Sequence, residues 1–263
     1  MAEGPKTEMK PQVYKDPRPA EHFDRFHART RAKRPNWMYE LVRLVLTPYL
    51  LLFFRTRAID TTKVPADGPV IVAPNHFSFM DHFFVAVYLR RKVQFMAKSQ
   101  LFKNPLQIVY HNGGVFPVRR GHKDDEAFKT AHAVLARGGI VVMYCEGGRS
   151  RTGELGEPKA GIGRLALESG APVVPVALVG SERVRDWKRL QFPKVSVQFG
   201  DPIRFEKVEE PTREQSQAAS EQIFARIRGL WQGLRENGRG ATVKAARAAR
   251  RAAEAAGRRP ARP

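Results

Sequence analysis

The stretch VIVAPNHFSFMD, residues 70–81, decides the fold and holds the first candidate site. Its apolar part, residues 70–73, is bounded by glycine and proline, a pattern that predicts a buried strand. The following residues, 81–88, are rich in Phe, Val and Ala and predict the start of a helix. His76 therefore lies where a strand gives way to a helix, a common position for catalytic groups in open α/β sheets.

His76 and Asp81 form a candidate catalytic pair, because five positions allow their side chains to meet if the helix begins near Phe79. A carboxylate that binds an imidazole fixes its tautomer and stabilises its cation, so the histidine can take a proton from a hydroxyl group. Taken alone, the two residues have a second, equally good interpretation: the histidine is exposed in a loop and the aspartate caps the helix that follows.

Strand and helix patterns alternate along residues 64–200, which predicts one α/β domain with a largely parallel central sheet flanked by helices. Beyond the first strand, we expect strands at 93–97, 115–118, 140–145, 173–179 and 195–199. We expect helices at 124–137, 160–169 and 213–235. The chain then divides into a disordered N-terminus (1–35), an apolar helix (36–57), the folded domain (58–236) and a tail (237–263) that is disordered or helical in patches.

Residues 37–54, WMYELVRLVLTPYLLLFF, have apolar side chains at helical spacing. Eighteen residues reach the short limit of a membrane span, and Glu40, Arg43 and Pro48 interrupt the apolar run. We therefore expect a membrane-associating helix that lies in the interface; a full span and a helix buried in the domain are the alternatives.

The 263 residues include 46 Lys and Arg against 26 Asp and Glu, a net charge of +20. This excess predicts anionic partners, such as phosphates, an anionic membrane surface or nucleic acid. Aromatic residues gather in apolar runs instead of alternating with basic ones, so we expect no nucleic-acid partner. The single cysteine excludes an intrachain disulfide, no histidine spacing resembles a metal site, and no secretory signal is visible.

Asn75, His76, Ser78 and Asp81 reproduce the block Asn-His-x-Ser-x-x-Asp, which resembles the first block of the glycerolipid acyltransferase family, as found in bacterial 1-acyl-sn-glycerol-3-phosphate acyltransferases. Three further blocks follow in the family's order, within residues 64–200. The resemblance implies an α/β acyltransferase domain in which His76 and Asp81 are the general-base pair.

Gly114, Phe116 and Arg119 resemble the second block, in which an Arg follows a strand. The resemblance implies that Arg119 binds the phosphate of the acceptor, since a guanidinium can contact a phosphate through two hydrogen bonds. Lys98 resembles a further basic position of the family and is expected at the same phosphate.

The segment YCEGGRS, residues 144–150, resembles the third block, Phe-Pro-Glu-Gly-Thr-Arg-Ser. By this resemblance Arg149 is a second phosphate ligand, while Glu146, Gly147 and Gly148 position the substrate or its oxyanion. Gly148 replaces Thr, so the contribution of that hydroxyl is absent or replaced. Cys145 replaces Pro and is expected to be a packing residue at a strand end rather than a nucleophile.

Pro175, in Val-Pro-Val, resembles the fourth block and is expected beside a strand, where it shapes the pocket wall. Together the blocks imply acyl transfer from acyl-CoA or an acyl-carrier protein to the 2-hydroxyl of 1-acyl-sn-glycerol 3-phosphate (lysophosphatidic acid), giving phosphatidic acid without a metal or other cofactor. We expect a peripheral or monotopic protein on the cytoplasmic face of the cell membrane. The alternatives are glycerol 3-phosphate or another lysophospholipid as acceptor, and a non-catalytic basic protein that binds membranes or nucleic acid.

Overall fold

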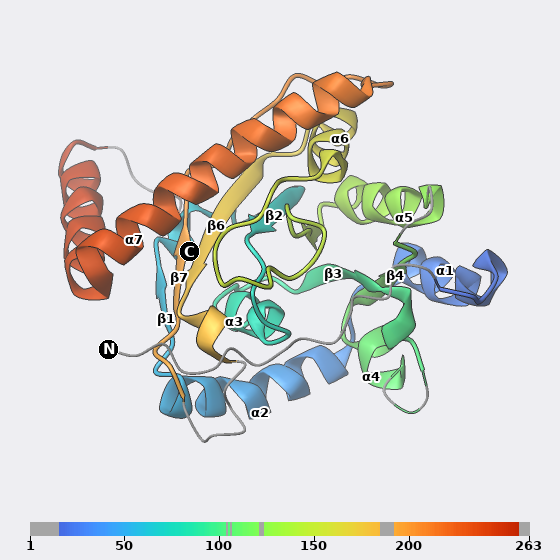
Figure 1. Ribbon diagram of the computed structural model, residues 1–263, viewed down its shortest axis with the longest axis horizontal. Helices are drawn as coiled ribbons and strands as arrows, with labels where there is room; N and C mark the ends of the chain where they lie inside the picture. Colours follow the sequence, from blue (N-terminus) through green and yellow to red (C-terminus); the bar gives the residue numbers. More distant parts are fainter. Residues whose placement is uncertain (1–15, 104, 106, 121–123, 185–191, 258–263) are drawn as a thin grey trace.

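The computed structural model of the protein describes residues 16–103, 105, 107–120, 124–184 and 192–257. A seven-stranded sheet in the order β1-β7-β6-β2-β5-β3-β4 forms its centre (Figure 1). The strands are β1 Arg57–Ile59, β2 Val70–Pro74, β3 Val93–Lys98, β4 Val115–Val118, β5 Ile140–Val142, β6 Val173–Val179 and β7 Ser196–Phe199. The five strands from β6 to β4 are mutually parallel, while β7 is antiparallel to β6 and parallel to β1. The prediction of a single α/β domain with a largely parallel sheet is confirmed.

The helices cover both faces of this sheet (Figure 1). They are α1 Asp24–Ala32, α2 Trp37–Phe53, α3 Asp81–Ala86, α4 Gln107–Asn112, α5 Asp125–Ala136, α6 Ala160–Ser169 and α7 Arg213–Ala255, with short 3-10 segments at Ala20–Phe23, Thr61–Lys63 and Ser99–Leu101. Because successive strand residues point to opposite faces, Val70 and Val72 of β2 pack with α2 and α3, whereas Ile71 and Ala73 pack with α5, α6 and α7. The continuously apolar strand sequences follow from this double coverage.

The described part of the N-terminal segment differs from the expected disorder. Residues 20–32 are helical, and Phe23 and Phe26 are buried in a cluster with Phe102. The guanidinium of Arg18 donates to the backbone carbonyls of Ser99 and Phe102, both at 2.7 Å. Tertiary contacts of this kind hold a segment whose composition alone predicts disorder; residues 1–15 lie outside the described residues.

Helix α2 begins after Asn36, whose side chain accepts the backbone N–H of Met38, as is usual at a helix N-cap. One side of the helix buries Tyr39 and Leu50 against the sheet. The other side leaves large apolar side chains in solvent, including Leu44 at 71% and Leu52 at 74% exposure. None of the helices in the described part of the chain is both long and apolar enough to cross a membrane.

Helix α7 continues well beyond its predicted end, and its backbone breaks once, at Gly238 (φ 73°, ψ 161°). After the break, the guanidinium of Arg239 donates to the carbonyls of Arg55 and Val195 and to the hydroxyl of Ser196. These bonds fix the second part of α7 beside β1 and β7. The tail is therefore helical as far as Ala255, where patches of helix or disorder were expected.

Candidate active site

The predicted blocks come together at one edge of the sheet, because parallel strands end there. His76 follows β2, the segment 144–150 follows β5, Lys98 ends β3, and Arg119 follows β4. Since β5 lies between β2 and β3 in the sheet, segments that are far apart in sequence converge on this edge. This is the usual location of ligand sites in open α/β sheets.

His76 and Asp81 are in direct contact, with 2.8 Å between Nδ1 of the imidazole and Oδ2 of the carboxylate. The same Oδ2 accepts the backbone N–H groups of Phe77 and Ser78, at 2.7 and 2.8 Å. A carboxylate partner places the imidazole proton on Nδ1, so Nε2 keeps its lone pair. The pair therefore presents a proton acceptor of defined orientation.

The electrostatic environment keeps His76 neutral. Burial lowers the pKa of His76 below its ordinary 6.5, and the charges of Arg120 and Arg149 lower it further, while Asp81 opposes both effects. A neutral imidazole with a fixed tautomer is the form that a general base requires. The site therefore favours the neutral imidazole near neutral pH.

Asn75 and Ser78 hold the loop that carries His76. The amide of Asn75 donates to the carbonyl of Leu178 and accepts the N–H of the same residue, which ties the loop to β6. The hydroxyl of Ser78 accepts the backbone N–H of Met80, just before α3. Both side chains are buried and bonded to the backbone, so in this structure they set the loop conformation.

Glu146 connects the loops after β2 and β5. Its two carboxylate oxygens accept the backbone N–H groups of His76 at 2.9 Å and Gly156 at 2.8 Å. Burial raises the pKa of Glu146 to about 7, although both hydrogen bonds oppose the rise. The neighbouring Gly147 has φ 64°, a left-handed conformation that favours glycine. Glu146 thus positions the backbone of His76, while an oxyanion role for Gly147 and Gly148 stays a prediction.

A cavity of about 420 Å³ opens beside His76. Three cationic side chains, Lys98, Arg120 and Arg149, line it together with the imidazole. Burial lowers the pKa of Lys98, and the positive charges of Arg149 and Arg120 lower it further. The rest of the wall is largely apolar and includes Phe79, Phe83, Phe95, Met96, Leu101 and Val115. One hollow therefore combines a base, three positive charges and apolar surface.

The structure places Arg119 outside this cavity and Arg120 inside it. The guanidinium of Arg119 donates to the backbone carbonyl of Arg18, at 3.2 Å. Arg119 follows the last residue of β4 and Arg120 lies in a turn, so the conformation of this turn determines which arginine faces the cavity. Of the two arginines, Arg120 lines the cavity and was missed by sequence reasoning, while phosphate binding at this place stays a prediction.

Gly114 and Pro175 have structural positions outside the cavity. A Cβ at Gly114 would come within 2.6 Å of the Pro35 side chain, and its φ is +88°. Pro175 lies inside β6, not beside a strand as expected, and forms no part of the described cavity wall. Proline has no backbone N–H to donate to a neighbouring strand. The strand tolerates Pro175 because the antiparallel pairing of β6 with β7 begins only at the next residue, Val176.

Cys145 is 1% exposed and packs in the core between the sheet and α5 to α7. Burial raises the pKa of its thiol well above the ordinary value. A thiol that stays protonated is a poor nucleophile. This environment agrees with the packing role expected from the sequence.

Two further aromatic side chains of the cavity were missed by sequence reasoning. Tyr144 stacks on His76 with 3.8 Å between ring centroids and 17° between ring planes. His82 also lines the cavity, and burial lowers its pKa to about 4. Aromatic residues at a strand end and a helix start are ordinary core residues by pattern, so no sequence signal marked them.

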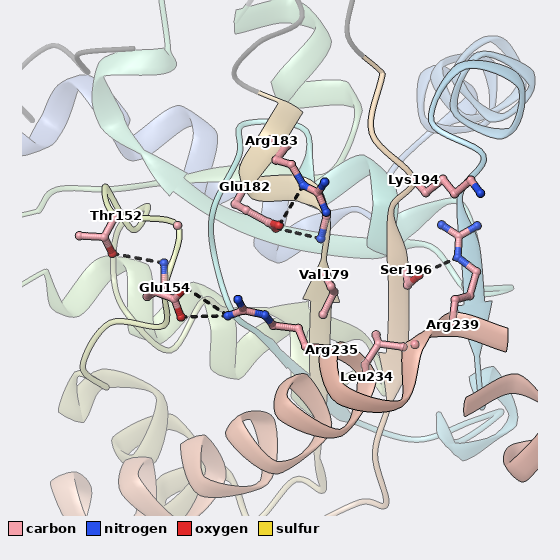
Figure 2. Close-up of a pocket in the computed structure, with 13 residues that line it drawn as sticks. Thr152, Glu154, Val179, Glu182, Arg183, Lys194, Ser196, Leu234, Arg235 and Arg239 are labelled. Atoms are coloured by element: carbon pink, nitrogen blue, oxygen red, sulfur yellow. Dashed lines mark hydrogen bonds and ion pairs between the residues drawn. The ribbon is translucent and has the colours of Figure 1, made fainter. Parts of the chain in front are cut away.

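A second hollow, of about 510 Å³, lies where β6 ends and β7 begins, beside α7 (Figure 2). Two of its four cationic side chains pair with its two carboxylates: Arg235 with Glu154 at 3.0 Å, and Arg183 with Glu182 at 3.6 Å. Among the residues that the structure describes, none of the predicted site residues lines this second hollow. The catalytic candidates therefore belong to the cavity beside His76.

Residues 55–179 match the sequence profile of the family described as Acyltransferase, and this segment contains the whole cluster from His76 to Arg149. Over this segment, just under half of its length, the chain is similar to the acyltransferase family. Two curated relatives are chloroplastic 1-acyl-sn-glycerol-3-phosphate acyltransferases. The one from Brassica napus is 26% identical over 166 residues, which are 62% of this chain and 46% of the relative. The one from Arabidopsis thaliana is 30% identical over 136 residues, which are 50% of this chain and 38% of the relative.

Other relatives of the chain bear a different name. The glycerol-3-phosphate acyltransferase of Pseudomonas fluorescens (strain Pf0-1) is 26% identical over 183 residues, which are 54% of this chain and 22% of the relative. The chain thus spans less than half the length of these curated relatives. Among solved structures, the 1-acyl-sn-glycerophosphate (LPA) acyltransferase PlsC from Thermotoga maritima shares the fold, with a TM-score of 0.52 at 19% identity. The match covers 80% of this chain and 89% of PlsC.

Proposed function

We propose that the protein transfers an acyl group from a thioester to a hydroxyl group of a phosphate-bearing glycerolipid precursor. The observation that carries this proposal is the single cavity in which a neutral, oriented His76 faces three cationic side chains and an apolar wall. The base can deprotonate a hydroxyl group, the cations can bind a phosphate, and the apolar surface can bind an acyl chain.

In the proposed reaction, Nε2 of His76 takes the proton of the acceptor hydroxyl as its oxygen attacks the carbonyl carbon of the thioester. The carbonyl oxygen becomes an oxyanion, the C–S bond then breaks, and the leaving thiolate receives the proton from His76. Asp81, bonded to Nδ1, stabilises the imidazolium that forms in between. General-base catalysis of this kind contributes about 10²–10⁴-fold to the rate.

Lys98, Arg120 and Arg149 are proposed to bind the acceptor phosphate. Like charges placed close together repel one another, and the lowered pKa of Lys98 reflects burial together with this repulsion. A phosphate monoester with nearly two negative charges relieves the repulsion when it binds. Binding of the phosphate also holds the acceptor hydroxyl beside His76 in the orientation that the reaction requires.

We propose 1-acyl-sn-glycerol 3-phosphate as the acceptor, which makes phosphatidic acid the product. This choice is supported by the names of the plant relatives and by the apolar share of the cavity wall. Glycerol 3-phosphate is the second candidate, supported by the name of the Pseudomonas relative. Acyl-CoA and an acyl-carrier protein both supply the required thioester.

A peripheral position on the cytoplasmic face of a membrane completes the proposal. The exposed apolar side of α2 suits the interface, since it leaves side chains such as Leu44 and Leu52 without protein cover. The net charge of +20 favours an anionic lipid surface. Such a position brings a lipid acceptor to the cavity without a membrane-spanning segment.

Arg120 and its neighbour Arg119 provide a matched test of this proposal. Arg120→Ala should raise the acceptor KM or lower kcat, costing about 1.5–3 kcal/mol, or roughly ten- to a hundredfold in kcat/KM. Arg119→Ala should leave acceptor kinetics unchanged, because its guanidinium contacts the backbone of Arg18. On a monoacylglycerol, which lacks the phosphate, the Arg120 variant should match the wild type. Equal losses on both acceptors would show that Arg120 is structural and that the phosphate site lies elsewhere.

A further inference from the structure

We propose that the hydroxyl of Tyr144 donates a hydrogen bond to the oxyanion that forms on the thioester carbon, which makes Tyr144 a catalytic residue. The inference rests on the proposed acyl transfer and adds a donor for the charge that His76 creates. Three observations support it: the stacking of the ring, the lack of a partner for the hydroxyl, and an exchange of residues within the third block.

The ring of Tyr144 is held against the catalytic imidazole. Tyr144 comes two residues after β5, and its ring lies nearly parallel to that of His76, 3.8 Å away between centroids. Both residues line the same cavity. Stacking on a buried, hydrogen-bonded imidazole limits the positions of the phenol, so its hydroxyl is fixed relative to His76 before substrate binds. A donor fixed in this way needs no reorganisation during the reaction.

The hydroxyl of Tyr144 is buried, yet among the described residues it has no hydrogen-bond partner. Burying an unpartnered hydroxyl costs free energy, so such groups are uncommon in folded proteins. The hydroxyls of two other tyrosines do have partners: half-buried Tyr88 donates to the hydroxyl of Thr56 at 2.7 Å, and the oxygen of Tyr39 accepts the N–H of Val93. An unsatisfied hydroxyl on a residue that lines the cavity points to a partner that the substrate brings.

The sequence of the third block shows a matching exchange of hydroxyl groups. The block that residues 144–150 resemble has Phe at the first position and Thr at the fifth, whereas this chain has Tyr144 and Gly148. The hydroxyl missing at Gly148 is thus accompanied by a new one at Tyr144. The exchange suggests that the site retains a hydroxyl donor and takes it from a different residue.

The oxyanion is a better partner for this hydroxyl than the phosphate is. Three cations already face the phosphate, whereas the oxyanion forms next to His76, on which the phenol stacks. Burial, with a smaller effect of Asp81, raises the pKa of Tyr144 well above 10, so the hydroxyl remains protonated and can donate across the working pH range. The charge that it stabilises exists only during the reaction, so the expected effect is on kcat.

Tyr144→Phe tests the proposal, because it removes the hydroxyl and keeps the stacking ring. With an acyl-CoA donor and 1-acyl-sn-glycerol 3-phosphate, we expect kcat to fall by roughly 10²-fold, with little change in either KM. The melting temperature should be unchanged or higher, since an unsatisfied buried hydroxyl is lost. Tyr88→Phe is the matched control: it removes a hydroxyl with a partner outside the cavity, so the melting temperature should fall and kcat should stay constant.

Several outcomes would overturn the proposal. A Tyr144→Phe protein with wild-type kcat excludes the oxyanion contact, and a rise in KM limited to phosphate-bearing acceptors assigns the hydroxyl to the phosphate instead. A fall in kcat that accompanies a lower melting temperature makes Tyr144 a structural residue. If the wild type transfers no acyl group, the proposed function fails together with this inference; if the wild type is active and Tyr144→Phe is equally active, only this inference fails.

Discussion

Replacing Glu146 by Gln tests how the two catalytic loops are held together. The carboxylate of Glu146 accepts the backbone N–H groups of His76 and Gly156, yet burial raises its pKa from 4.5 to about 7. The folded state therefore binds the Glu146 proton more tightly than the unfolded chain does. The corresponding stability is fully present below pH 4.5 and is lost as the pH rises through about 7.

The size of the effect follows from these two pKa values. Between pH 5 and pH 8, ionisation of Glu146 should lower the free energy of unfolding by about 2.5 kcal/mol. A glutamine side chain carries no proton that titrates in this range, so the Glu146→Gln variant should lack this share of the pH dependence. The glutamine side chain has only one oxygen, so its NH2 group would face one of the two backbone N–H donors and leave that donor without an acceptor. This loss lowers the free energy of unfolding by about 1–3 kcal/mol at every pH.

Urea unfolding of both proteins at pH 5 and pH 8 measures the effect. Other groups titrate in this range, but they are common to both proteins and cancel in the difference. We expect the stability advantage of the wild type to be about 2.5 kcal/mol larger at pH 5 than at pH 8. An advantage that is constant, or larger at pH 8, would refute the reasoning, because the two hydrogen bonds would then outweigh the cost of burying the charge.

Three further predictions concern other parts of the molecule. Cys145→Ala should retain activity comparable to the wild type, because the thiol packs in the core; an inactive, folded variant, or acyl group trapped on the wild-type thiol, would contradict this. Leu44→Ser with Leu52→Ser should weaken binding to anionic vesicles by about 3 kcal/mol, roughly a hundredfold in sedimentation assays, whereas high salt alone should not release the wild type. The acid limb of kcat/KM, which reports the groups of the free protein, should lie below the ordinary histidine pKa of 6.5, and a His76 limb above 6.5 would exclude the lowered pKa.

The sequence predicts the layers of the fold well because each buried strand is apolar along its length. Elements with a weak pattern were missed: β1 has only three residues, and residues 20–32 are polar except for the side chains that anchor them. The composition of residues 237–263 predicted a tail that is disordered or helical in patches, but Arg239 binds the backbone carbonyl of Arg55 and the helix continues to Ala255. In each case tertiary contacts override the local composition.

The candidate site was predictable where spacing along the chain determines the contact. His76 and Asp81 meet because one turn joins β2 to α3, and the family blocks locate Arg149 and Glu146. The choice between Arg119 and Arg120 depends on the conformation of the turn after β4, which no sequence pattern determines. The stacking of Tyr144 on His76 depends on the approach of two separate loops and is visible only in three dimensions.

The rate of acyl transfer by the His76→Ala variant tests the central claim most directly. Purified protein would receive an acyl-CoA and 1-acyl-sn-glycerol 3-phosphate, with the diacyl product quantified by mass spectrometry and the fold checked by thermal unfolding. We predict that the wild type forms phosphatidic acid and that the folded His76→Ala variant forms it about 10²–10⁴-fold more slowly. A folded variant with a rate within a few-fold of the wild type would contradict the account.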